Sequence, residues 1–192
     1  MMHDVAATSP MIIVTITGLL ALIAGVFSPR GESSGWLGAI IGAGFALALA
    51  ATWWLSDQLP IALTTNALSG SLTLDAFGLM LGAVILIGSL LTTWTAPEYL
   101  AEQDADHHEY YALIAFSTLG MMAMVTAADF LTLFVALEVM SIAIYVLAGF
   151  KRQSPFATEA AMKYFILGSF ASALLLLGVA FLYGVTGEGM GH

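Results

Sequence analysis

Long apolar runs dominate the chain, and short polar segments separate them. Six of these runs predict helices long enough to cross the hydrocarbon core of a bilayer, which takes about 20 residues. The runs are too long and too evenly apolar for the alternating strands of a membrane barrel. The pattern therefore predicts an all-α, polytopic transmembrane helix bundle. The predicted spans are Met11–Phe27, Trp36–Leu55, Ala76–Thr95, Tyr110–Ala128, Phe130–Phe150 and about Pro155 to Tyr183.

Local signals mark the ends of several spans. Ser154 followed by Pro155 is typical of a helix start, and Asp129 is predicted to be a turn residue that caps the fifth span. The third span is expected to end before Pro97, because proline interrupts the hydrogen bonds of a helix. Residues 59–75 are expected to form a long polar loop.

The connections suggest two parts. Residues 1–109 hold the first three spans and an acidic loop over 97–109 that is expected to be cytoplasmic. Residues 110–192 hold the last three spans, whose connections are short. We therefore expect 110–192 to begin one compact unit.

Composition supports the membrane assignment and excludes several kinds of site. Hydrophobic residues make up 60% of the chain and charged residues 9%, whereas a soluble domain is roughly one quarter charged. The net charge of −9 excludes nucleic acid as a partner, since phosphate contacts need clustered lysine and arginine. Without cysteine the chain cannot form disulfides, zinc–thiolate sites or iron–sulfur ligands. The lipid bilayer is the first expected partner.

Three of the four basic residues lie in loops and predict the orientation. Arg30 follows the first span, and Lys151 and Arg152 follow the fifth. With six spans both loops lie on the same face, and the positive-inside rule places that face in the cytoplasm.

Two charged residues lie inside predicted spans and are the candidate functional residues. Ionisable groups within a membrane are costly and usually face a bundle interior, where they mark ion pathways. Counted from Phe150, Glu138 lies about 18 Å deep, and counted from Pro155, Lys163 lies about 12 Å deep. The two are therefore expected at similar levels, where a facing pair would have coupled protonation suited to moving a proton. The alternative is a static ion pair that orders the helices.

Other charged residues have simpler interpretations. Glu159, four residues before Lys163, is an alternative partner for that lysine, although a carboxylate in a first helical turn also complements the helix dipole. The segment Glu102–Glu109 contains His107 and His108 among carboxylates. A solvated acidic loop is favoured there over a metal site, because zinc-ligand spacing is absent. No nucleotide-binding or Ser-His-Asp motif is present.

The last part of the chain, residues 130–187, resembles the antiporter-like N subunit of proton-pumping NADH–quinone oxidoreductase (respiratory complex I). The resemblance rests on L-E-x-M-S around Glu138, on E-A-A-x-K-Y-F-x-L-G-S-F-A-S around Lys163 and on the closing L-Y-G-x-T-G. Residues 1–109 match that family in their pattern of spans.

The resemblance implies a fold of fourteen spans with two inverted five-helix units, the first of which begins in the last three spans here. It implies that Glu138 and Lys163 carry proton translocation, driven by quinone reduction elsewhere in the complex. NADH, FMN, iron–sulfur clusters and quinone would be used by other subunits, and this chain would bind no cofactor or metal. Its partners would be the other membrane subunits. Its location would be the bacterial plasma (inner) membrane, or the mitochondrial inner membrane in a eukaryote.

The chain departs from that family by stopping at His192, after the sixth predicted span. A truncated product or a split subunit would explain this, and the remainder of the family's chain is expected to be needed for pumping. Two other functions remain open. One is a subunit of a related cation/proton antiporter or membrane-bound hydrogenase complex, and the other is a purely structural membrane subunit.

Overall fold

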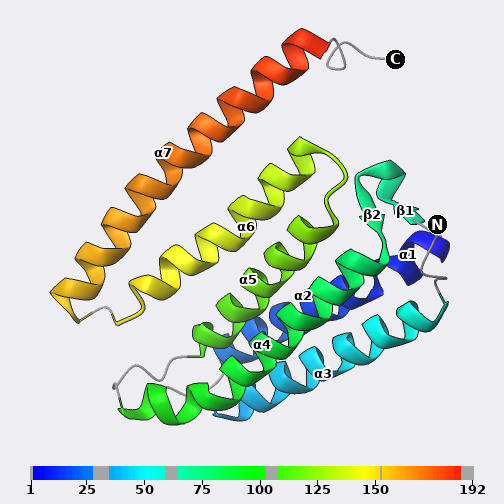
Figure 1. Cartoon of the computed structure of the whole chain (residues 1–192). Helices are drawn as coiled ribbons and strands as arrows, with labels where there is room; N and C mark the ends of the chain where they lie inside the picture. The colour runs from blue at the N-terminus through cyan, green and yellow to red at the C-terminus, as the bar shows by residue number, and fades with distance from the viewer. Residues whose placement is uncertain (1, 28–34, 59–64, 103–107, 152, 187–192) are drawn as a thin grey trace.

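Long helices run up and down through a bundle that carries a small hairpin at one end (Figure 1). The computed structural model describes residues 2–27, 35–58, 65–102, 108–151 and 153–186. In chain order the elements are α1 (Met2–Ala7), α2 (Ser9–Phe27), α3 (Gly35–Gln58), β1 (Thr65–Ala67), the 3₁₀ turn η1 (Leu68–Gly70), β2 (Leu72–Leu74), α4 (Ala76–Glu102), α5 (Glu109–Thr126), α6 (Phe130–Ala148) and α7 (Pro155–Thr186).

Six long helices of the described chain coincide with the predicted spans, and five of them are long and apolar enough to cross a membrane. These five are α2, α3, α4, α6 and α7. The remaining helix, α5, begins with Glu109 and buries hydroxyl groups at Ser117, Thr118 and Thr126. The expected helical, multi-pass membrane architecture is therefore confirmed, whereas a sixth crossing by α5 stays a prediction.

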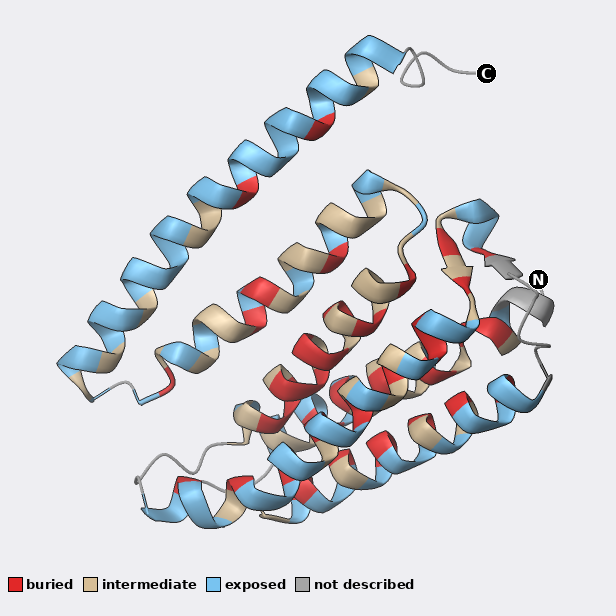
Figure 2. Ribbon diagram, viewed as in Figure 1, coloured by how far each residue is buried: buried red, intermediate tan, exposed pale blue. Residues whose placement is uncertain are grey.

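The core lies where α5 passes between α2, α4 and α6 (Figure 1). Figure 2 shows many buried positions on α5, whereas α7 is mostly exposed. Tyr111 of α5 is fully buried and covers Gly38 of α3, where a Cβ would lie 2.8 Å from the tyrosine ring. Helix α5 contacts α2 and α4, which precede residue 109 in the chain, and α6, which follows it. The packing is therefore continuous across residue 109, and the division of the chain at that residue stays a prediction.

A hairpin occupies part of the segment that was expected to be a polar loop. Strands β1 and β2 pair antiparallel, and the turn between them places Leu68, Ser69 and Gly70 at positive φ. The backbone N–H of Ala128 donates to the carbonyl of Ser71 at 2.9 Å, which ties the hairpin to the junction between α5 and α6. The expectation of a long polar loop over 59–75 is therefore corrected for residues 65–74, because backbone hydrogen bonds between the two strands and to Ala128 fold them into a hairpin.

Helix α4 continues through Pro97 to Glu102, so the predicted end of the third span before this proline is wrong. Proline removes one hydrogen bond of the helix, but membrane helices tolerate this where neighbouring helices and hydroxyl groups satisfy the freed carbonyl. Ala96 and Leu100 on either side are buried in the core. Packing therefore holds the helix together across the proline.

Contacts at one end of the bundle agree with the predicted topology. Gly25, near the end of α2, packs against His108, just before α5. The ring centroids of Tyr110 and Phe150 are 5.2 Å apart, which joins the start of α5 to the end of α6. The end of α2, the start of α5 and the end of α6 thus share one side of the bundle, as the orientation argument requires. Arg30, Arg152 and the C-terminal residues 187–192 lie outside the described residues.

Asp129 caps α6 as predicted. Its Oδ1 accepts a hydrogen bond from the backbone N–H of Thr132 at 2.7 Å, and its Oδ2 accepts one from the Thr132 hydroxyl at 2.8 Å. The backbone hydrogen bond from Thr132 is the main cause that lowers the pKa of the Asp129 carboxyl from its usual value.

We predict that Asp129→Ala lowers the free energy of unfolding by about 1 kcal/mol, the usual cost of losing such a cap. Asp129→Asn should retain most of this stability, because asparagine caps helices equally well. Since the folded-state pKa is lowered, the contribution of the charge is present above the unfolded pKa of about 3.9 and is lost as the pH falls through the folded value. Thermal unfolding in nanodiscs at neutral and acidic pH measures this, and equal losses for alanine and asparagine would contradict it.

Candidate functional site

Glu138 lies near the middle of α6 and is the charged residue of that helix. Its side chain is half-buried, and its Oε1 is buried without a hydrogen-bond partner among the described residues. A carboxylate in an apolar helix needs compensation by hydrogen bonds, opposite charge or protonation. Glu138 is therefore a group whose charge depends on what its neighbours supply.

Two close contacts set the register of the antiparallel helices α6 and α7. Gly149 packs against Ala161, since a Cβ on this glycine would lie 2.8 Å from the Ala161 Cβ. Four residues before Gly149, Tyr145 reaches across to α7, and its hydroxyl covers Gly168. A Cβ on this glycine would collide with the tyrosine hydroxyl. The Tyr145 ring also packs edge-on against Tyr164 at a centroid distance of 5.0 Å. Glycine at 168 thus lets an aromatic side chain approach the backbone of α7.

Glu138 occupies the side of α6 that faces α7. It precedes Tyr145 by seven residues, which is close to two full turns, so the two side chains leave the helix in nearly the same direction. The Gly149–Ala161 contact places Ser172 of α7 at the level of Glu138, because Glu138 lies eleven residues before Gly149 and Ser172 lies eleven residues after Ala161.

Lys163 lies on the opposite face of α7. It follows Ala161 by two residues, which turns it about 200° away from the face that contacts α6. Its Nζ donates to Oε1 of Glu159, and the two side chains are 69% and 59% exposed. The structure therefore pairs Lys163 with Glu159, which sequence considerations had weighed as the alternative partner.

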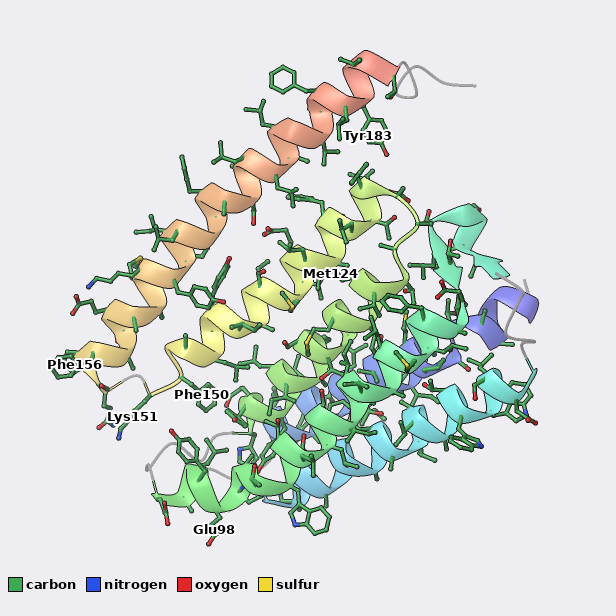
Figure 3. All side chains as sticks on the ribbon, viewed as in Figure 1. Glu98, Met124, Phe150, Lys151, Phe156 and Tyr183 are labelled. Carbon is green, nitrogen blue, oxygen red and sulfur yellow. The ribbon has the colours of Figure 1, made fainter. Side chains whose placement is uncertain are left out.

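Glu138 and Lys163 do not face each other in this arrangement of the helices. Lys163 lies nine residues before Ser172, the residue level with Glu138, which corresponds to about 14 Å along the helix. The earlier count assumed that Phe150 and Pro155 lie side by side. In the structure α7 extends beyond the end of α6 before Ala161 meets Gly149, and Figure 3 shows Phe156 at this protruding end and Tyr183 near the other.

The acidic segment 102–109 is described only at Glu102, His108 and Glu109, so its interpretation as a solvated loop stays a prediction. His107 lies outside the described residues. Within the part of the chain that the structure describes, no group of three or more His, Asp and Glu side chains is placed to hold a metal ion.

Sequence reasoning overlooked buried hydroxyl groups. Ser141 on α6 is 9% exposed and Ser172 on α7 is 8% exposed. Between α4 and α5, the hydroxyl oxygens of Ser89 and Thr118 lie 2.7 Å apart in a hydrogen bond. The spacing of Ser141, three residues after Glu138, was a signal on the printed sequence, because residues three apart are neighbours on a helix.

Comparison with known proteins relates the chain to one family. Residues 127–190 match the family described as NADH:quinone oxidoreductase/Mrp antiporter, TM. NADH-quinone oxidoreductase subunit N of Trichlorobacter lovleyi is 40% identical over 93% of this chain, and subunit N 1 of Sorangium cellulosum is 41% identical over 95%. The chain covers 35% and 38% of these two relatives, so it spans a little over a third of their length.

Two solved structures share the fold. Respiratory complex I from Thermus thermophilus contains a chain that is 28% identical and superposes with a TM-score of 0.74 over 93% of this chain and 37% of its own length. An archaeal membrane-bound sulfane sulfur reductase contains a chain with a TM-score of 0.77 over 96% of this chain and 38% of its own, and at 24% identity it shows the fold alone. The family model and the subunit N relatives together show that the chain matches part of the N subunits of NADH-quinone oxidoreductase, and the complex I structure shows the same fold.

Proposed function

We propose that this chain serves in the membrane arm of a proton-translocating NADH–quinone oxidoreductase, and that protons pass through Glu138. The observation that carries the proposal is the half-buried Glu138 carboxyl, whose Oε1 is buried without a hydrogen-bond partner among the described residues, in a helix with no other charged residue. A group in this position marks an ion pathway, because burying it in a membrane is costly without a function. The subunit N relatives supply the reaction to which this pathway would be coupled.

Lys163 would be a second ionisable group of the pathway, at a different depth in the membrane from Glu138. With its partner Glu159 on the outer face of α7, it acts about 14 Å from Glu138 along the helix axis. Coupling between the two residues would then pass through α7 and not through a direct ion pair. Ionisable side chains on membrane helices seldom face lipid, so this outer face would be covered by another segment of the membrane arm.

The proposal assigns electron transfer to other subunits. NADH, FMN, iron–sulfur clusters and quinone would act there, and the sequence here contains no cysteine that could ligate a cluster. Six spans, including α5, would place the Lys151 end of the bundle in the cytoplasm. The host membrane would be the bacterial inner membrane, and the other membrane subunits would be the partners.

Affinity purification tests this assignment. We expect an affinity-tagged chain, expressed in its own host, to co-purify from solubilised membranes with a complex that oxidises NADH and reduces quinone. A complex with hydrogenase or cation/proton antiport activity would assign the chain to those related assemblies instead. If the chain co-purifies with an active complex and Glu138→Gln leaves proton pumping by that complex unchanged, the role of the chain is purely structural.

A further inference from the structure

The contact between α6 and α7 contains two buried serines near the level of Glu138. The Gly149–Ala161 contact places Ser172 at the level of Glu138, and Ser141 lies one turn along α6, three residues after Glu138. Burial agrees with this placement, because both serines are less than 10% exposed and few other residues of α6 and α7 are buried. Figure 2 shows the buried positions of α7 on the side of that helix that faces α6.

Ser172 stands out on α7. Among the residues of this helix it is buried together with Val179, and these two lie two turns apart on the face towards α6. Serine at a helix contact in a membrane lets two backbones approach and can hydrogen-bond across the interface. A purely packing role would account for the small size of the side chain.

The position of Glu138 indicates that the two serines do more than pack the helices. Ser141 lies one turn from Glu138 on the same side of α6, and the buried Oε1 of Glu138 has no hydrogen-bond partner within the part of the chain that the structure describes. Buried polar atoms are hydrogen-bonded in the great majority of cases, and an exception calls for an explanation. The register of the two helices places a serine on each of them within about one turn of this carboxyl.

We infer that Ser141 and Ser172 relay the proton that Glu138 takes up and releases, an assignment that rests on the function proposed above. In the outward step the carboxylic acid O–H of Glu138 gives its proton to a serine Oγ while that hydroxyl gives its own proton onward. The Tyr145 hydroxyl, one turn further along α6, is the next acceptor and passes its own proton to water. Each hydroxyl is neutral again afterwards, Glu138 is left as a carboxylate, and no bond between heavy atoms changes.

The double variant Ser141→Ala/Ser172→Ala tests the relay in the assembled complex in membrane vesicles. Alanine keeps the helix propensity and the small size but removes both hydroxyls. We expect the rate of proton pumping per assembled complex to fall at least about tenfold, and its solvent deuterium isotope effect to rise, as proton transfer becomes limiting. Thr92→Ala is the matched control, because it removes an exposed hydroxyl from α4 that bonds only within its own helix.

The outcomes separate this inference from the proposed function. Loss of pumping in Glu138→Gln together with normal pumping in the serine double variant would overturn the relay alone. Less assembled complex with unchanged pumping per complex would show that the serines only pack the helices, which also overturns it. Normal pumping in the Glu138→Gln variant would contradict the proposed function itself.

Discussion

Gly120→Ala is expected to be the most damaging small substitution in the bundle. A Cβ at this position of α5 would lie 2.5 Å from the backbone nitrogen of Met140 and 2.8 Å from its Cα. Backbone atoms of a packed helix cannot rotate away, so α5 and α6 would have to separate along their whole contact. Overpacking of this kind costs about 1–3 kcal/mol or more. The melting temperature of the protein in nanodiscs should therefore fall by several degrees.

Gly82→Ala provides the matched control for this prediction. Gly82 lies inside α4, and a Cβ there would meet nothing within 4 Å. Alanine is favoured over glycine in a helix interior by about 0.5–1 kcal/mol, so this variant should melt at the same temperature as the wild type or slightly higher. Equal melting temperatures for the two alanine variants would show that α5 and α6 do not approach as closely as the structure indicates.

Sequence signals that act within a few residues predicted the helix starts well. The cap at Asp129 and the start of α7 at Pro155 depend on neighbouring residues, and both are confirmed. Pro97 shows the limit of such signals. Its local tendency to end a helix was overridden by the packing of α4 against the rest of the bundle.

The candidate site depended on long-range geometry that the pattern of spans does not contain. Depth counted from the helix ends assumed that the end of α6 and the start of α7 lie at the same level, but Gly149 at the end of α6 meets Ala161, six residues into α7. The contacts of Gly149 and Gly168 set the true register, and a single sequence does not state which residues those glycines meet. The face on which Lys163 lies depends on the same register.

Glu138→Gln is expected to abolish proton pumping by the assembled complex, with a loss of at least about tenfold. Glutamine has nearly the same shape as glutamate but cannot bind and release a proton at neutral pH. Pumping is measured as acidification or alkalinisation of sealed vesicles after NADH is added, normalised to the amount of complex. Glu98→Gln is the control, because Glu98 is exposed at the end of α4, away from α6 (Figure 3).

The stability of the same variant should move in the opposite direction. A neutral amide is cheaper to hold in an apolar helix than a carboxylate, so Glu138→Gln should melt at or above the wild-type temperature. A structural salt bridge or hydrogen bond at Glu138 would instead make the variant less stable, because its partner would be left buried and unpaired. Loss of pumping with unchanged or higher stability would therefore assign Glu138 to proton transfer, whereas loss of both would indicate that it holds the helices together.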